Sequence, residues 1–256
     1  MLNNLVKSIS YSAYRDYLKC PRLYYYRRVM KLKLPFDPIQ LVLGKSFHLA
    51  LELLEKENKD PVSVFATDFT KDKVTGVSMS KFMAEREEAL RLLSFWSEHK
   101  DELLCEAGIE IDETERRFEI KVDKDPLTGL RLSLPPITGV VDYTEKLRCA
   151  LGDYKTSSKK YSQEMVDESD QPTFYYLWYL IEKGKLPDVF SYIVFRKGIK
   201  RQPIQILTTT RTLTQVSNLL SSMQKVVMQI ENREFTLRHK DGEFCDCGLY
   251  EDMLRV

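Results

Sequence analysis

Apolar residues recur every three or four positions through the first 104 residues, which is the spacing of the buried face of an amphipathic helix. The pattern is clearest around Phe47, because Leu43 and Leu54 lie on the same predicted face. Residues 1–104 are therefore expected to form a helical N-terminal part. The predicted helices run from a cap at Ser10 or Ser12 to about residue 29 with a break at Pro21, and over residues 40–56, 61–73 and 80–104.

Alternating apolar and polar residues replace this spacing from about residue 109 and indicate β-strands. One aromatic-rich helix is inserted at residues 170–183, and another follows at 212–232. This order indicates an α/β fold of mixed α+β character, with a mixed central sheet flanked by helices. We expect a single domain over residues 1–256, with a sheet-containing core at 105–234 and an irregular, cysteine-containing tail at 235–256. The predicted strands cover residues 109–122, 130–143 (with a bend at Pro135-Pro136), 147–155, 187–196 and 202–207.

The composition is that of an ordinary globular protein, with 43% hydrophobic and 30% charged residues among 256. No apolar run approaches the ~20 residues needed to span a bilayer, and the N-terminus lacks the apolar core of a signal peptide. Five cysteines, an odd number, argue against a disulfide framework. We therefore expect a soluble, cytoplasmic protein with no membrane partner.

The net charge of +1 is an average over two opposed regions. Residues 1–34 carry eight Lys or Arg and one Asp, whereas residues 101–119 carry eight acids and two arginines. Six of the 14 tyrosines lie beside the basic cluster, so this segment can follow phosphates and stack on unpaired bases. The alternative is an amphipathic helix with its tyrosines packed inward. The candidate nucleic-acid-binding residues are Tyr14, Arg15, Lys19, Arg22, Arg27 and Arg28.

Two aspartates frame a predicted hairpin in the strand region. A hairpin that turns between residues 147 and 148 places Asp142 opposite Asp153, and strand alternation places Lys155 on the same face as Asp153. Two carboxylates held this close repel each other unless a cation lies between them, and oxygen ligands suit Mg²⁺ or Mn²⁺. The alternative is a surface hairpin with both aspartates solvated.

Four short motifs follow one another along the chain. They are Gly44-x-x-x-His48, Gly139-x-x-Asp142, Asp153-x-Lys155 and Gln171-x-x-x-Tyr175. In order and approximate spacing they resemble the RecB-type nucleases of the PD-(D/E)XK superfamily, which include CRISPR-adaptation nucleases and AddB-type recombination nucleases. The resemblance runs from about residue 8 to residue 180 and implies a restriction-endonuclease-like core.

The resemblance implies a divalent-metal site that hydrolyses phosphodiesters. His48, Asp142 and Asp153 would ligate Mg²⁺ or Mn²⁺, helped by the backbone carbonyl of Tyr154. These residues thus gain an implied role as metal ligands.

The resemblance also assigns positioning roles. Lys155 would orient the attacking water or stabilise charge on the phosphate, while Gln171 and Tyr175 would position the site and the nucleic-acid strand. Glu115 is a looser match to the family's upstream acidic residue.

Members of this family often hold a [4Fe–4S] cluster with one cysteine in the first helix and three near the C-terminus. Cys20 matches the first position, but the tail offers only Cys245 and Cys247, and four thiolates are the usual requirement. The tail is therefore one cysteine short of the family's cluster-binding set. Three interpretations are open, namely a degenerate cluster site, a zinc site completed by His239, and free thiols.

The sequence therefore predicts a metal-dependent DNA nuclease, and specifically an exonuclease acting on single-stranded DNA or DNA ends in recombination, repair or CRISPR adaptation. No G-x-x-x-x-G-K-[ST] motif is present, so any unwinding would come from a partner helicase, or from a recombination or CRISPR protein that supplies opened ends. Two alternatives are a non-catalytic nucleic-acid-binding module on a nuclease fold and a hydrolase of another phosphorylated substrate.

Overall fold

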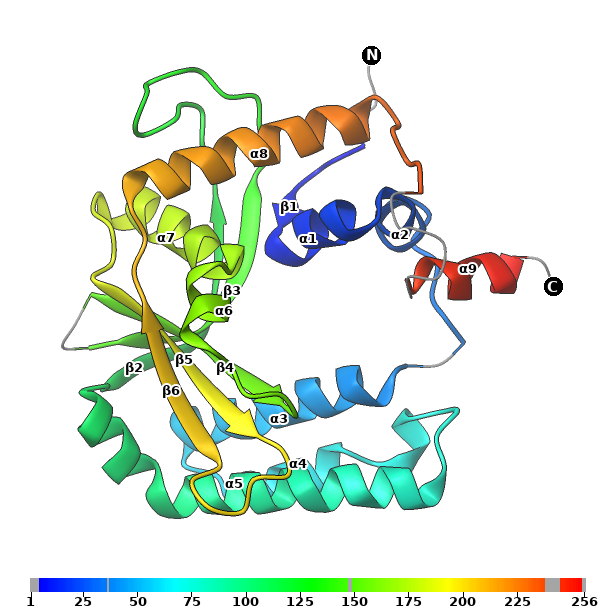
Figure 1. The fold of residues 1–256 in the computed structure, drawn as a ribbon, viewed down its shortest axis with the longest axis vertical. Coiled ribbons are helices and arrows are strands. Elements are labelled where there is room, and N and C mark those ends of the chain that lie inside the picture. The colour runs from blue at the N-terminus through cyan, green and yellow to red at the C-terminus, as the bar shows by residue number, and fades with distance from the viewer. Residues whose placement is uncertain (1–4, 36, 147–148, 238–244, 255–256) are drawn as a thin grey trace.

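A mixed β-sheet forms the centre of the structure, a computed structural model that describes residues 5–35, 37–146, 149–237 and 245–254 (Figure 1). Its strands are β1 (Ile9–Ser10), β2 (Ile111–Ile120), β3 (Ile137–Glu145), β4 (Ala150–Ser157), β5 (Val189–Arg196) and β6 (Ile204–Thr209). The order is β1-β3-β4-β5-β6, with β2 also paired to β3. Strands β1 and β3 run parallel, as do β4 and β5, and the other pairs are antiparallel. The predicted fold class is confirmed.

Helices cover both faces of the sheet (Figure 1). They are α1 (Tyr11–Lys19), α2 (Pro21–Tyr24), the π-helical turn η1 (Tyr25–Val29), α3 (Ile39–Glu57), α4 (Pro61–Asp68), the 3₁₀ turn η2 (Lys71–Lys73), α5 (Met79–Ala107), α6 (Gln163–Asp167), α7 (Asp170–Lys183), α8 (Leu213–Glu231) and α9 (Cys247–Leu254). Helices α1, α7 and α8 share one hydrophobic core, and α3, α4 and α5 share the other. Among the described residues, no helix is long and apolar enough to cross a membrane.

The structure corrects two of the predicted elements. The strand predicted from residue 130 begins only at Ile137, because Pro135 and Pro136 lack the N–H donors that a ladder needs. The tail predicted as irregular contains α9. The break at Pro21 is confirmed, since α1 ends just before it and α2 begins on it.

The sheet is split along one edge of β3. Strand β2 occupies the other edge over the whole length of β3. On the split edge, β4 pairs only with Tyr143 and Thr144, and β1 pairs only with Ile137 and Thr138. Within the described part of the chain, positions 139–142 therefore have no strand partner on this edge.

A glycine allows β3 and β4 to approach each other closely beside the split. A Cβ added to Gly152 would lie 1.9 Å from the ring of Tyr143, so a larger residue there would have to displace a buried aromatic ring. The hydroxyl of Tyr143 donates a hydrogen bond to the carbonyl oxygen of Ser191 at 3.4 Å. The glycine that precedes Asp153 is thus a packing requirement.

Candidate active site

Asp142 lies at the end of the split. Its carboxylate accepts a backbone hydrogen bond there in place of a paired strand. The backbone N–H of Tyr154 donates to Asp142 Oδ2 at 2.7 Å, and His48 Nδ1 lies 3.4 Å from the same oxygen. The pairs between β3 and β4 have the register that the predicted hairpin requires, although its turn, residues 147–148, lies outside the described residues. Asp142 and Asp153 are the positions that follow the last pair, Tyr143 with Gly152.

Glu115 lies on β2 opposite Asp142, because the pairs on either side of it fix the register. Its φ angle of 52° is unusual for a residue other than glycine, and an irregularity in the strand pairing ends just before it. Glu115 Oε1 lies 3.9 Å from His48 Nδ1. Like charges directly opposite each other on paired strands are unfavourable, so this arrangement favours a bound cation.

The donor set formed by His48, Glu115 and Asp142 fits a divalent ion. One ligand atom from each of these residues lies within 4.8 Å of the other two. Carboxylate oxygens suit Mg²⁺ and Mn²⁺, and imidazole is a common transition-metal ligand. The resident metal that the sequence implies is therefore compatible with the residues present.

The pKa values of Asp142 and His48 indicate that several carboxylates lie close together around them. Burial, and then the charge of Asp153, raise the pKa of Asp142 to about 7. Burial lowers the pKa of His48, but its interaction with Glu115 and the charges of Asp142 and Asp153 outweigh burial and raise that pKa to about 8. A cation bound here would be attracted by all of these carboxylates.

Asp153 is held by contacts to α7 and to Lys155. Its Oδ1 accepts a hydrogen bond from Gln171 Nε2 at 2.6 Å, and its Oδ2 forms an ion pair with Lys155 Nζ. Burial lowers the pKa of Lys155, but the charges of Asp153 and Asp142 outweigh burial and raise it above its usual value. The Lys155 ammonium therefore stays protonated, and it lies 5.9 Å from the centre of the Tyr192 ring.

Tyr175 completes the backbone hydrogen bonding inside the split. Its hydroxyl donates to the carbonyl oxygen of Val140 at 2.8 Å and accepts from Gln171 Nε2 at 3.4 Å. Burial raises the pKa of Tyr175 well above its usual value, so the hydroxyl remains a neutral donor. The N-terminal cap of α7 at Ser169 places Gln171 in the first turn, facing β4.

The structure brings the predicted catalytic and metal-ligating residues to one place and adds a carboxylate that the sequence matched only loosely. The backbone N–H of Tyr154 donates to Asp142, and the side chain of Tyr154 is buried. The added carboxylate is Glu115. The residues gathered at the split are His48, Glu115, Asp142, Asp153, Tyr154, Lys155, Gln171 and Tyr175.

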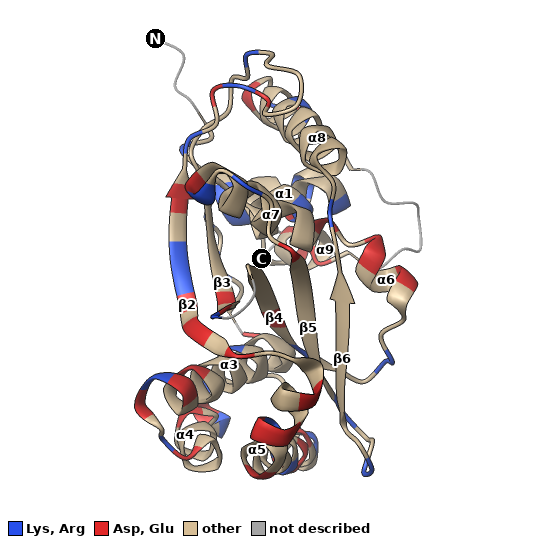
Figure 2. Cartoon of the chain, turned by 90° about the vertical axis from the view of Figure 1, so that its left-hand side faces the viewer, with Lys and Arg blue, Asp and Glu red and all other residues tan. Residues whose placement is uncertain are grey.

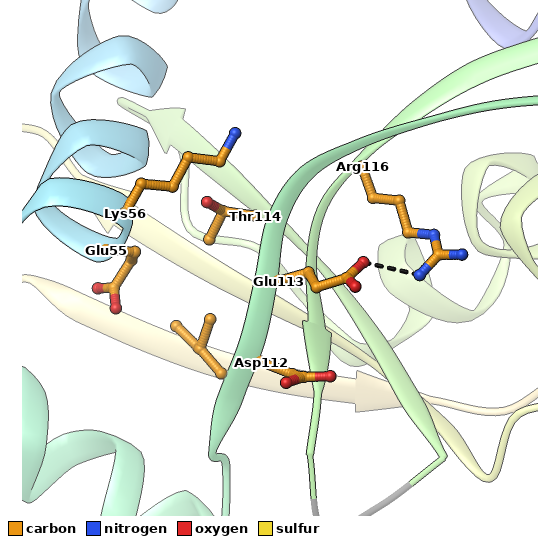
Figure 3. Close-up of a pocket in the computed structure, with 7 residues that line it drawn as sticks. Glu55, Lys56, Asp112, Glu113, Thr114 and Arg116 are labelled. Atoms are coloured by element: carbon orange, nitrogen blue, oxygen red, sulfur yellow. Dashed lines mark hydrogen bonds and ion pairs between the residues drawn. The ribbon is translucent and has the colours of Figure 1, made fainter.

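Pockets beside β2 differ in the residues that line them. An open pocket of about 450 Å³ is lined by His48, Glu115 and Asp142 together with Gly44 and Lys45 of α3. Another, of about 490 Å³, is shown in Figure 3 and contains none of the predicted site residues. The first pocket therefore gives access to the candidate site. The second is lined by Glu55, Lys56, Ile111, Asp112, Glu113, Thr114 and Arg116.

In the basic N-terminal segment, fewer of the predicted binding residues are exposed and unpaired than the sequence suggests. Tyr14 is buried and its hydroxyl lies 2.8 Å from Ser222 Oγ, which corrects the expectation that its ring stacks on a base. Arg15 and Lys19 are exposed and form no ion pair within the described part of the chain. Acidic residues lie along β2 and on α5 (Figure 2).

The other three predicted basic residues pair with acids of this chain. Arg22 pairs with Glu251 at 3.1 Å, while Arg27 pairs with Asp16 at 3.1 Å and with Asp246 at 2.8 Å. Arg28 also pairs with Asp16, at 3.0 Å. Of the predicted basic residues, Arg15 and Lys19 of α1 are therefore the two that form no ion pair within the described part of the chain.

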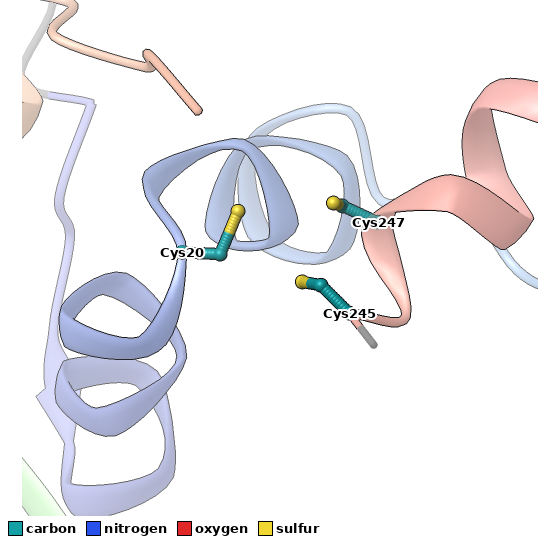
Figure 4. Close-up of side chains that lie close together, drawn as sticks. All are labelled: Cys20, Cys245 and Cys247. Atoms are coloured by element: carbon teal, nitrogen blue, oxygen red, sulfur yellow. The ribbon is translucent and has the colours of Figure 1, made fainter. Parts of the chain in front are cut away.

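Cys20, Cys245 and Cys247 form a separate group, with sulfur atoms within 4.8 Å of one another (Figure 4). The remaining two cysteines lie elsewhere, so the structure does not assemble the four thiolates of a [4Fe–4S] cluster. His239, the predicted fourth zinc ligand, lies outside the described residues.

The comparisons with known proteins agree with the fold. Residues 8–249 match the family model of the PD-(D/E)XK nuclease superfamily, and the chain belongs to this superfamily. Its members are usually metal-dependent nucleases. No curated protein matches the sequence.

A solved structure shares the fold. A protein from Eubacterium rectale, described as "Putative exonuclease", is 13% identical, with a TM-score of 0.53 over 94% of this chain and 86% of its own. The structure of SSO0001 is 11% identical, with a TM-score of 0.40 over 91% of this chain and 80% of its own, and no argument rests on it.

Proposed function

We propose that this protein is a divalent-metal-dependent deoxyribonuclease of the RecB type, an exonuclease that hydrolyses phosphodiester bonds of single-stranded DNA or of DNA ends. The observation that carries the proposal is the convergence of His48, Glu115 and Asp142 within 4.8 Å, beside the ion pair of Asp153 and Lys155. Membership of the nuclease superfamily supports the reaction class. A non-catalytic module would have no need to keep a lysine beside the metal-binding carboxylates.

The carboxylates and His48 would hold the ion. Asp142 is held in place by the N–H of Tyr154, and Asp153 by the amide of Gln171. A bound Mg²⁺ or Mn²⁺ would act as a Lewis acid on the phosphate and lower the pKa of water. We include Asp153 and the backbone carbonyl of Tyr154 among the ligands, and we add Glu115.

Lys155 supplies the fixed positive charge of the site. Its ammonium donates to a phosphate oxygen as negative charge develops there during attack by water, which is the kind of preorganised contact that lowers a barrier most. Gln171 keeps Asp153 oriented, and Tyr175 keeps the unpaired stretch of β3 in place. These two are positioning residues.

The substrate reaches the site past the exposed positive charges of α1. Arg15 and Lys19 contact phosphates of a single strand, which makes binding weaker as salt rises. A helicase, a recombination protein or a CRISPR protein supplies the opened strand.

End-labelled single-stranded DNA tests the proposal. We expect shortening from an end in Mg²⁺ or Mn²⁺, no cleavage in chelator, and protection of circular single strands. Asp142→Asn and Lys155→Met should each lower the rate at least about 100-fold. Asp112→Asn, an exposed aspartate of β2, serves as the matched control and should cut normally.

Three results would overturn parts of the proposal. Cleavage that persists in chelator, or in both site variants, contradicts the catalytic assignment. Cleavage of circles contradicts the exonuclease mode. Tight DNA binding without cleavage in either metal favours the non-catalytic alternative.

A further inference from the structure

A second, thiol-lined site lies away from the carboxylates. Cys20 occupies the junction of α1 and α2, while Cys245 and Cys247 lie at the start of α9 (Figure 4). All three are buried, with Cys20 fully inaccessible and Cys247 at 1% exposure. Residues far apart in the sequence thus place three sulfur atoms within 4.8 Å of one another.

The spacing of the three sulfur atoms fits one ion better than a cluster. Thiolates 2.3 Å from a tetrahedral zinc ion lie about 3.8 Å from one another, within the distance that the three sulfur atoms keep here. An iron–sulfur cluster inserts several irons and sulfides between its ligands and normally takes four cysteines. Cys105 is exposed at the end of α5, and Cys149 Sγ lies 2.8 Å from Lys185 Nζ, so neither supplies a fourth thiolate.

We propose that Cys20, Cys245 and Cys247 bind a single thiophilic divalent ion, Zn²⁺ or one of similar chemistry, which fixes α9 to the N-terminal helices. The fourth coordination position is filled by a ligand other than cysteine. The site is structural and does not depend on the proposed nuclease activity.

The packing of α9 explains why a bound ion would stabilise its position. The three cysteines share a small buried cluster with Leu23, Tyr26 and Tyr250, separate from both main cores. Such a cluster supplies little stability by itself, and small cores are commonly stabilised by a metal. The ion pairs of Arg22 and Arg27 with acids at and beside α9 are partly exposed and so add little.

The docked helix also helps to shape a basic pocket. Tyr250 of α9 lines a pocket of about 570 Å³ together with Arg27, Lys33 and Lys45. Lys45 also lines the pocket of the candidate active site. The ion would thus hold one wall of a basic surface that continues toward the carboxylates.

Metal analysis of the Asp142→Asn protein tests the proposal, because this background weakens the carboxylate site. The full-length protein is purified anaerobically without chelator, and zinc, iron and acid-labile sulfide are counted per chain. We expect one zinc, no sulfide, and thiolate-to-cobalt charge-transfer absorption when Co²⁺ replaces zinc. Chelation should change the near-ultraviolet circular dichroism of Tyr26 and Tyr250, whose rings stack 5.7 Å apart, and zinc should restore it.

Variants separate this site from the other cysteines. Cys20→Ser and Cys247→Ser should each bind zinc at least tenfold more weakly. The Cys105→Ser/Cys149→Ser protein, which retains only the three clustered cysteines, should bind it normally. If a serine variant fails to fold, the double variant and the chelation experiment still decide.

Several results would overturn the proposal. Iron with stoichiometric sulfide would mean a cluster, and loss of zinc in the double variant would mean a fourth cysteine ligand. Absence of any stoichiometric metal would leave three free thiols. None of these results bears on cleavage of DNA, so the nuclease proposal is tested separately.

Discussion

Asp142→Asn should stabilise the metal-free protein above neutral pH while it lowers the cleavage rate at least about 100-fold. Burial and the charge of Asp153 raise the pKa of Asp142 from 3.8 to about 7. The carboxyl group is therefore harder to ionise in the folded chain than in the unfolded chain. Ionised Asp142 accordingly opposes folding, and an uncharged amide of the same size removes that cost.

The size of the effect follows from the two pKa values. At 1.36 kcal/mol for each pH unit, the difference between 3.8 and about 7 corresponds to about 4 kcal/mol as an upper bound. The destabilisation is absent below pH 3.8, grows as the pH rises toward 7, and is fully present above 7. The amide oxygen can still accept the N–H of Tyr154. For a chain of this size, each kcal/mol raises the melting temperature by about 2–4 °C.

Urea unfolding in chelator between pH 4 and pH 8 measures this difference through the fluorescence of the buried Trp96 and Trp178. We expect the two proteins to have equal free energies of unfolding near pH 4 and the variant to be more stable at pH 8. Mn²⁺ should stabilise the wild type and leave the variant nearly unchanged. Asp112→Asn is the control and should follow the wild type. A variant less stable than the wild type at pH 8, or a difference independent of pH, would refute the reasoning.

Three further substitutions test other parts of the site. Tyr175→Phe removes the donor to a buried β3 carbonyl, so urea unfolding should show a loss of about 1–3 kcal/mol; an unchanged midpoint contradicts this role. Gly152→Ala should lower the melting temperature sharply, because the new methyl group would overlap the Tyr143 ring, whereas Gly44→Ala has open space and should be neutral or slightly stabilising. Glu115→Gln should weaken Mn²⁺ binding in calorimetry at least about tenfold while leaving the fold intact; unchanged affinity would exclude Glu115 from the metal site.

Helices with local end signals could be predicted from the sequence alone. Residues 170–183 are helical as predicted, because Ser169 caps the first turn and Gly184 adopts a positive φ of 74° just after the last. Strand β1 could not be predicted, since its two residues form a strand only by pairing with β3. Helix α9 is equally dependent on its contacts, which join it to α2 and η1.

The relative positions of site residues could be predicted within a single hairpin. They could not be predicted where they depend on how strands distant in the sequence pair. The hairpin fixed the relation of Asp142 to Asp153, because strand alternation and a single turn determine it. The position of Glu115 depends on the register between β2 and β3, which an irregularity in the pairing shifts near residues 111–114. Glu115 could be recognised as a candidate acidic residue from the segment Glu115-Arg116-Arg117-Phe118. The amino-acid sequence around it, however, does not indicate the shift in strand pairing.

The split in the sheet is what allows one site to draw on both of its faces. His48 comes from α3 on one face, and Gln171 comes from α7 on the other, so a continuous ladder would keep them apart. Where the ladder is interrupted, the carboxylate of Asp142 takes the N–H of Tyr154, and Tyr175 satisfies the carbonyl of Val140. A strand that paired with these positions would occupy the place where the carboxylate meets the imidazole. The unpaired stretch of β3 is therefore a requirement of the proposed site, and in the proposed mechanism the side chains that satisfy its backbone also hold the reacting groups in place.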